Sequence, residues 1–263
     1  MVESLKELNQ ICQKPRYKEV GNWMVRHILR DAALPITRLL LYTSITANQV
    51  TLISLFVALA GILCFSILSN VSFLLGAILL QAWYLLDHVD GQIARYRKTD
   101  CMTGRFFDYV THHLIHGVIY FSLGLYCYRR GTNLFFIVWG FTISVAAIFF
   151  NISQDIKFKT FYEYLVKSKQ VEIKTETGST GNQKPSLIKS LFSFLHKIFE
   201  IHVMMNILTL CAIIQFWTPD FDFRFFLFGI YGLIVPFLAV TKISHMITSR
   251  AVDVEFKRLF KTS

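Results

Sequence analysis

Acidic side chains at helical spacings lie between two strongly apolar runs of this 263-residue chain. The segment from Asp87 to His112 reads D-H-V-D-G-Q-I-A-R-Y-R-K-T-D-C-M-T-G-R-F-F-D-Y-V-T-H. On a helix, Asp87 and Asp90 share one face. Asp108 and His112 share one face of the next helix. Two helices that meet across a turn would therefore bring three carboxylates and an imidazole together.

These groups could bind a divalent cation. An unpaired charge at the edge of a membrane costs roughly 2.5 to 3.5 kcal/mol on insertion scales, so carboxylates held there need compensation. Several oxygen ligands suit Mg²⁺, Mn²⁺ or Ca²⁺. The alternative is a structural salt-bridge network between the aspartates and the nearby basic residues Arg95, Arg97 and Lys98.

The segment resembles the signature of the CDP-alcohol phosphatidyltransferase family. That signature is D-x-x-D-G-x-x-A-R, followed after eight residues by G-x-x-x-D-x-x-x-D. The chain matches it at Asp87, Asp90, Gly91, Ala94, Arg95, Gly104 and Asp108. His112 stands where the family has its last aspartate. The resemblance covers about residues 15–245 and is strongest from Ile45 to His116.

The resemblance implies an enzyme that moves a phospho-alcohol from a CDP-alcohol donor to an acceptor hydroxyl and releases CMP. Such reactions belong to phospholipid or related lipid and glycan biosynthesis, with CDP-diacylglycerol as a typical donor. The resemblance also implies one or two Mg²⁺ or Mn²⁺ ions and, in many members, a homodimer. It does not identify the acceptor.

By the same resemblance, the metal-site residues are Asp87, Asp90, Asp108 and His112. His112 would act chiefly as the catalytic base, because an imidazole accepts a proton near neutral pH. As a ligand it is neutral and softer than a carboxylate, so a second ion should bind more weakly.

Six further residues would contact the substrate. The resemblance gives this role to Gly91, Ala94, Arg95 and Gly104, and Arg95 can donate a fork of hydrogen bonds to a phosphate. In the first apolar run, Asn48 and Thr51 match the family's P-N-x-x-T, with alanine in place of the proline. The alternative role for Asn48 is to cap the helix that begins there.

The composition indicates a membrane protein. Hydrophobic residues make up 54% of the chain, charged residues only 17%, and the mean hydropathy is +0.46. A soluble domain of this size is less apolar. The net charge of +10 is spread over segments between apolar runs, so we expect membrane lipids rather than nucleic acid as partners. Five cysteines without a C-x-x-C pair indicate neither a disulfide framework nor a zinc site.

We predict an all-α, multi-pass membrane protein with six transmembrane helices and an N-terminal interfacial amphipathic helix. The six helices are expected at residues 45–68, 71–86, 105–128, 133–152, 202–217 and 224–243. Residues 1–44 would form a cytoplasmic segment, residues 45–245 the transferase domain with a cytoplasmic loop at 153–200, and residues 246–263 a cytoplasmic tail. Trp23 would anchor the interfacial helix, for which a soluble cap helix is the alternative.

Basic residues predict the orientation. The N-terminal segment, the loops after the second and fourth helices, and the C-terminal part contain seven, four, eight and five lysines and arginines. The opposite loops contain three, which are Arg129, Arg130 and Arg224. By the positive-inside rule, both termini and the active site should be cytoplasmic.

Two other functions remain open from the sequence. Aspartates and histidines within a membrane also build ion pathways, so an ion-coupled transporter is the alternative from a different class. Their clustering at one predicted cytoplasmic edge favours chemistry on a cytosolic nucleotide instead. The other alternative is a divergent or inactive family member with an altered donor or acceptor.

Three more histidines, His88, His113 and His116, have packing or hydrogen bonding between helices as their structural alternative.

Overall fold

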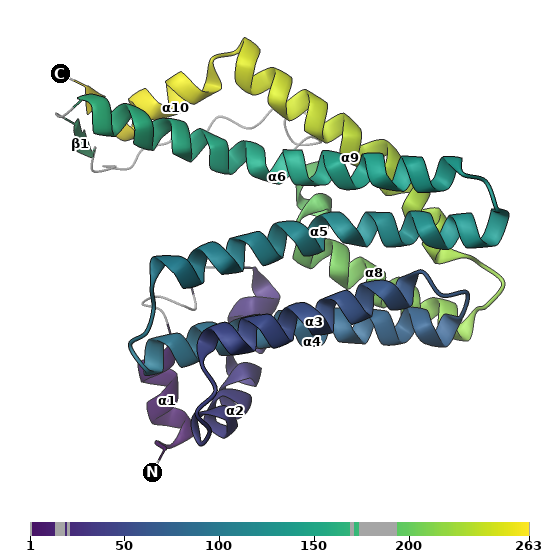
Figure 1. The fold of residues 1–263 in the computed structure, drawn as a ribbon, viewed down its shortest axis with the longest axis horizontal. Coiled ribbons are helices and arrows are strands. Elements are labelled where there is room, and N and C mark those ends of the chain that lie inside the picture. The colour runs from purple at the N-terminus through teal and green to yellow at the C-terminus, as the bar shows by residue number, and fades with distance from the viewer. Residues whose placement is uncertain (1, 14–18, 20–21, 169–170, 174–193, 263) are drawn as a thin grey trace. The chain divides into compact units, whose positions relative to one another are not determined.

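The computed structural model describes residues 2–13, 19, 22–168, 171–173 and 194–262. The chain divides into two compact units, which can be followed by colour in Figure 1. Unit 1 comprises Met1–Val118 and Ile207–Phe223, and unit 2 comprises Ile119–Asn206 and Arg224–Ser263.

The regular secondary structure in the described part of unit 1 is helical. It contains α1 (Leu5–Cys12), a π-helical turn (Val25–Leu29), α2 (Arg30–Leu41), α3 (Ala47–Phe65), α4 (Asn70–Tyr96), the first part of α5 (Met102–Gly131) and the second part of α8 (Ile201–Trp217). Thr46 caps α3: its side chain accepts from the backbone N–H of Gln49, whose own side chain accepts from Thr46 N at 2.8 Å. This capping box satisfies two helix-terminal donors, so Asn48 is not the N-cap.

Helices α3 and α4 run side by side and pack closely (Figure 1). Two glycines allow this approach. A Cβ atom on Gly76 would lie 2.6 Å from the carbonyl oxygen of Gly61 and 2.8 Å from the Phe65 ring. Because α4 carries Asp87 and Asp90, this contact fixes the height of the carboxylates relative to α3.

We expect Gly76→Ala to destabilise the protein by about 1–3 kcal/mol, because the added methyl group overpacks the contact between two backbones. The matched control is Gly229→Ala, since a Cβ atom there meets nothing within 4 Å. That change should be neutral or stabilise its helix by up to about 1 kcal/mol. Thermal unfolding in detergent measures both effects, and equal unfolding temperatures for the two variants would contradict the expectation.

The N-terminal helices pack against the polar face of α4. The Thr37 hydroxyl donates to Gln92 Oε1 at 2.6 Å, and Gln92 Nε2 donates to the backbone oxygen of Arg30 at 2.9 Å. One turn further, the Tyr96 hydroxyl donates to Glu3 Oε2 at 2.6 Å. The N-terminal segment is therefore a structural part of unit 1.

A helix does form where the interfacial helix was predicted, and its faces differ in solvent exposure. Val25 and Leu29 are buried, whereas Trp23 is 63% exposed and Ile28 47% exposed. The buried face is thus offset from the predicted Trp23 face. Contact of the exposed face with a membrane surface stays a prediction.

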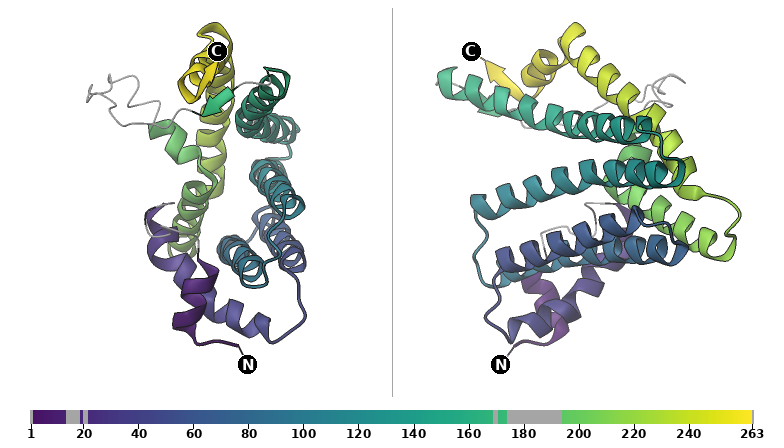
Figure 2. Two further views of the ribbon diagram at one scale, coloured as in Figure 1. Left: turned by 90° about the vertical axis from the view of Figure 1, so that its left-hand side faces the viewer. Right: turned by 45° about the vertical axis from the view of Figure 1, so that its right-hand side comes forward.

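Unit 2 consists of long helices with a short strand pair. It contains the second part of α5, α6 (Phe135–Ser168), the first part of α8, α9 (Phe223–Thr248) and α10 (Ala251–Leu259), and β1 (Val171–Ile173) pairs antiparallel with β2 (Phe260–Thr262). The ring of Tyr120 stacks on Phe199 and tilts against Tyr231 in its core. In both views of Figure 2, α10 lies beside the end of α6. An ion pair between Lys157 and Glu255 joins these two helices.

Four described helices are long and apolar enough to cross a membrane, where the sequence predicted six. They are Ala47–Phe65, Asn70–Tyr96, Phe135–Val166 and Phe223–Thr248. Helix α5 has 30 residues, but polar side chains such as Asp108 and His112 reduce its hydropathy. Helix α8 is apolar but has only 17 residues. The six-span arrangement and its orientation are therefore not confirmed.

The helix boundaries also differ from the predicted ones. Helix α6 continues to Ser168, so the start of the loop predicted at 153–200 is helical, because Phe161 and neighbouring apolar residues pack against α10. Residues 194–199 are also helical, and most of the remaining loop lies outside the described residues.

Candidate active site

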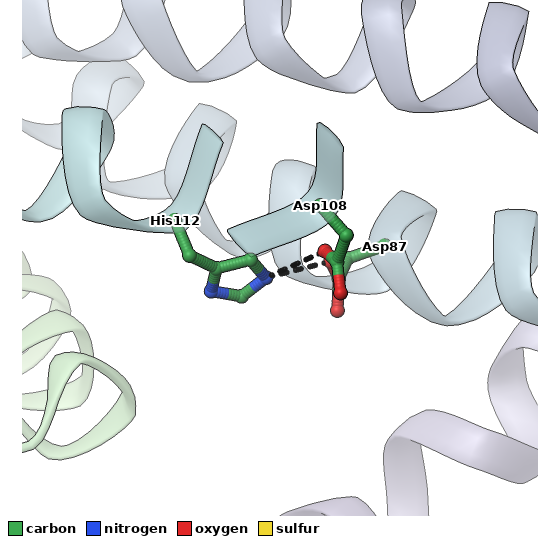
Figure 3. Close-up of side chains that lie close together, drawn as sticks. All are labelled: Asp87, Asp108 and His112. Atoms are coloured by element: carbon green, nitrogen blue, oxygen red, sulfur yellow. Dashed lines mark hydrogen bonds and ion pairs between the residues drawn. The ribbon is translucent and has the colours of Figure 1, made fainter. Parts of the chain in front are cut away.

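Helices α4 and α5 bring two of the three predicted carboxylates together with the imidazole within unit 1 (Figure 3). His112 Nε2 lies 2.8 Å from Asp87 Oδ1 and 3.3 Å from Asp108 Oδ1. One ligand atom from each of the three residues lies within 4.8 Å of the others. The spacing of four residues within α5 and the pairing of α5 with α4 together produce this group.

The donor set fits a divalent cation. It offers two hard carboxylates, which Mg²⁺ and Mn²⁺ prefer as ligands, next to one imidazole, which is a softer ligand. Asp108 Oδ1 is shielded from solvent and makes no hydrogen bond, although it is close to the His112 ring. A buried carboxylate oxygen without a hydrogen-bond donor normally has another compensating partner, and a cation would supply it.

The position of His112 limits what its ring nitrogens can do. A carboxylate only accepts hydrogen bonds, so Nε2 must carry the hydrogen that points to Asp87. In the neutral imidazole, Nδ1 then keeps its lone pair. The ring also packs against Trp83, which is fully buried, at 5.1 Å between centroids. The histidine is thus held in one orientation by a carboxylate and an indole.

Asp90 lies apart from this group of three. Its Oδ2 accepts a hydrogen bond of 2.5 Å from the hydroxyl of Thr51, which is buried on α3. Thr51 was predicted to contact substrate, but its hydroxyl is directed to the carboxylate. The residue therefore orients Asp90 in this structure.

A hollow of about 390 Å³ opens beside these carboxylates in unit 1. All six residues predicted to bind substrate line it, namely Asn48, Thr51, Gly91, Ala94, Arg95 and Gly104. Asp90 and Asp108 line it as well. Residues more than 50 positions apart in the sequence thus share one polar hollow with two predicted metal ligands.

The two motif glycines leave room in this hollow. A Cβ atom on Gly91 would lie 3.1 Å from Arg95 Nη1, and one on Gly104 would lie 3.4 Å from Asn48 Oδ1. A side chain at Gly91 would thus crowd the Arg95 guanidinium, whereas the contacts at Gly104 are of ordinary length. Both glycines widen the hollow that they line.

Arg95 is held from behind by the N-terminal helix. Its Nε donates to the backbone oxygen of Cys12, so the outer nitrogens of the guanidinium remain on the side of the hollow. Cys12 itself is fully buried, and burial raises the pKa of its thiol to about 11, so this residue is not a reactive thiolate. This contact could not be predicted from the sequence, because every residue has a backbone carbonyl.

The lining also includes a charged pair that was not predicted. Arg105 donates to Asp100 at 2.6 Å, and both line the hollow together with Tyr109. Asp100 lies in the variable spacer of the motif, and Arg105 directly follows Gly104. Their position next to the motif residues could have indicated that they line the same hollow.

The alternative for the aspartates was a network of salt bridges with nearby basic residues, and the described arginines have other partners. Arg97 donates to the backbone oxygens of Ile45 and Thr43, and Arg95 donates to that of Cys12. Neither arginine makes an ion pair with the three aspartates in the described structure.

The neighbouring histidines take other positions. His88 Nδ1 lies 2.8 Å from the backbone oxygen of Tyr84 on its own helix, and 3.8 Å from Asp87 Oδ2. His116 is buried a turn beyond His112. His113 is half-buried on the next face. The metal-ligand group of the described residues contains His112 and none of these three.

Comparison with known proteins agrees with this geometry. A search among curated proteins found no match. A family model described as CDP-alcohol phosphatidyltransferase matches residues 44–217, which is more than half of the chain and includes α3, α4 and α5. The chain therefore belongs to the CDP-alcohol phosphatidyltransferase family.

Proposed function

We propose that this protein transfers a phosphatidyl or related phospho-alcohol group from a CDP-alcohol to an acceptor hydroxyl and releases CMP. Its family performs phosphatidyl transfer of this kind in lipid synthesis and uses divalent metal ions. The observation that carries the proposal is the hollow lined by the six motif residues and two of the aspartates. CDP-diacylglycerol or a similar lipid is the proposed donor.

Asp87, Asp90 and Asp108 are the proposed metal ligands. A bound Mg²⁺ or Mn²⁺ would neutralise the diphosphate and the CMP that leaves. The closeness of the Asp87 and Asp108 carboxylates, together with the lack of a hydrogen bond to Asp108 Oδ1, supports this assignment. Thr51 holds Asp90 at the hollow, and Arg95 offers its outer nitrogens to a phosphate.

His112 is the proposed base. The acceptor oxygen forms a bond to the phosphorus of the donor, the bond from that phosphorus to the CMP oxygen breaks, and the hydroxyl proton moves to His112 Nδ1. Asp87 and Asp108 would stabilise the imidazolium that results, because both carboxylates lie next to Nε2. A ligand role for His112 would instead use Nε2, and the same nitrogen cannot carry a hydrogen and bind a metal at once.

Both termini and the hollow are proposed to be cytoplasmic. The distribution of lysines and arginines along the sequence supports this orientation. The homodimer that occurs in many family members is likewise a prediction for this chain.

The direct test is CMP release by the purified protein in lipid nanodiscs with CDP-diacylglycerol, Mg²⁺ or Mn²⁺, and a panel of hydroxyl acceptors. Release that requires donor, acceptor and metal together is expected. Binding of the donor without release would favour an inactive relative. Ion flux across sealed proteoliposomes without either would favour a transporter.

Thr51→Val should lower CMP release about 10- to 100-fold, because it removes a hydrogen bond to a charged group at the metal site. Its matched control is Thr142→Val, since the hydroxyl of that exposed threonine bonds only to its own helix, at 2.9 Å from the backbone oxygen of Val138. The concentration of metal that gives half-maximal rate should rise in Thr51→Val and stay constant in the control. An unchanged rate in Thr51→Val would remove this contact from the active site.

A further inference from the structure

Two adjoining hollows lie in unit 2, where residues 149–160 of α6 and 242–247 of α9 approach the start of α10. The first, of about 270 Å³, is mostly apolar and includes Phe149, Ile156 and Ile243 in its lining. The second, of about 250 Å³, is more polar and includes Lys242, His245 and Glu255. Lys157, Met246 and Val252 line both, so the two hollows are continuous.

The polar hollow has an excess of positive charge. Lys157 is only 5% exposed, and its Nζ donates to both carboxylate oxygens of Glu255 at 2.8 Å. Lys242 donates to the backbone oxygen of Phe150 at 2.9 Å and lies 3.9 Å from the centre of its ring. It makes no ion pair with any carboxylate that the structure describes. Glu255 thus neutralises Lys157. Asp155 acts on Lys242 through its charge but forms no described ion pair with it, so the Lys242 ammonium can still contact an anion.

The position of the lysines along the helices matches the surface of a membrane. Lys242 follows the apolar stretch of α9, and Lys157 follows that of α6. Long basic side chains at such positions reach lipid head groups while their stems cover apolar surface. On α10, the Phe256 ring packs on Phe161. The helix α10 therefore has an apolar face that packs on α6, and an apolar face is a feature of interfacial helices.

We propose that these hollows form a binding site for one anionic phospholipid, with an acyl chain in the apolar hollow and the phosphate beside Lys242. A soluble phosphate compound would leave the apolar hollow without a matching partner. A neutral lipid would leave the charge of Lys242 unmatched. The proposal involves none of the residues of the aspartate and histidine group and does not depend on the proposed function.

The first test is native mass spectrometry of the full-length protein released from nanodiscs of phosphatidylcholine with or without phosphatidylglycerol. The wild-type protein should retain one phosphatidylglycerol molecule. Lys242→Gln should reduce this retention about fivefold, because one basic contact to the head group is lost. The matched control is Lys159→Gln, which removes an exposed lysine of α6 that does not line either hollow. Equal retention of phosphatidylcholine, or equal effects of the two substitutions, would overturn the proposal.

A second pair of variants tests the apolar hollow. Val252→Trp should fill it and abolish retention, whereas Val254→Trp, on the exposed side of α10, should not. The unfolding temperatures of the two variants reveal whether Val252→Trp still folds. Should it not fold, the comparison of Lys242→Gln with Lys159→Gln decides the question alone. If inorganic phosphate displaces the lipid as well as phosphatidylglycerol does, the site is specific for phosphate and the lipid assignment is wrong.

Discussion

Asp108→Asn should lower CMP release by about 10²–10³-fold or more, because it removes a metal ligand on which the developing phosphate charge depends. Its side chain has nearly the same shape, so the packing of α5 should be unchanged. The buried Oδ1 has no hydrogen-bond donor that the substitution would lose. The rate at saturating Mn²⁺, with CDP-diacylglycerol as the donor, is the measurement.

A second measurement separates loss of metal from loss of fold. Metal bound to the native state raises the unfolding temperature of the wild-type protein by mass action. This rise should vanish in Asp108→Asn, while the unfolding temperature without metal should not fall, since one of several neighbouring negative charges is removed. The control is Asp253→Asn, at an exposed position of α10, which should keep both the rate and the metal-induced rise. A metal-induced rise that survives in Asp108→Asn would show that this carboxylate is not a ligand.

His112→Ala should lower the turnover number by about 10²–10⁴-fold, the usual contribution of a general base. The ring lies between two carboxylates, and no other histidine belongs to the metal-ligand group of the described residues. If His112 is chiefly a base, the Mn²⁺ concentration for half-maximal rate should hardly change. Wild-type turnover in this variant would exclude His112 as the base, and a large rise in that concentration would make it a ligand instead.

His112→Asp introduces the residue that the family signature predicts at this position. An aspartate can accept a proton and adds a hard, negatively charged ligand, so this variant should stay active and need less Mg²⁺ for half-maximal rate than the wild-type protein. The matched control is His113→Ala, at the adjacent half-buried position on another face of α5. It should leave the metal requirement unchanged. An identical Mg²⁺ requirement in His112→Asp and the wild-type protein would contradict the idea that the histidine weakens metal binding.

The local parts of this site follow from the sequence alone. Helical spacing places Asp108 and His112 on one face of α5, because residues four apart are neighbours on any α-helix. The family signature identified the residues that line the hollow, and hydropathy indicated membrane helices. These features depend on short-range geometry and composition, which a sequence displays directly.

The tertiary structure decided which of these groups meet. Gly61 and Gly76 allow α4 to approach α3 closely, and in the register that results Asp90 accepts a hydrogen bond from Thr51. The packing of α5 on α4 places His112 against Asp87. Such registers depend on the fit of side chains far apart in the sequence, and a shift of one helical turn would preserve every motif while separating the groups.

Contacts of backbone atoms and the lengths of the helices could likewise not be predicted from the sequence. The carbonyl oxygen of Cys12 holds Arg95, although no residue type is required to provide it. Helix α6 continues through its polar end because α10 packs beside it. Polar residues of the site give α5 a low hydropathy, so α5 is not among the four described helices that are apolar enough to cross a membrane. The sequence therefore identified the chemical groups of the site, and the packing of the helices determined which groups they contact.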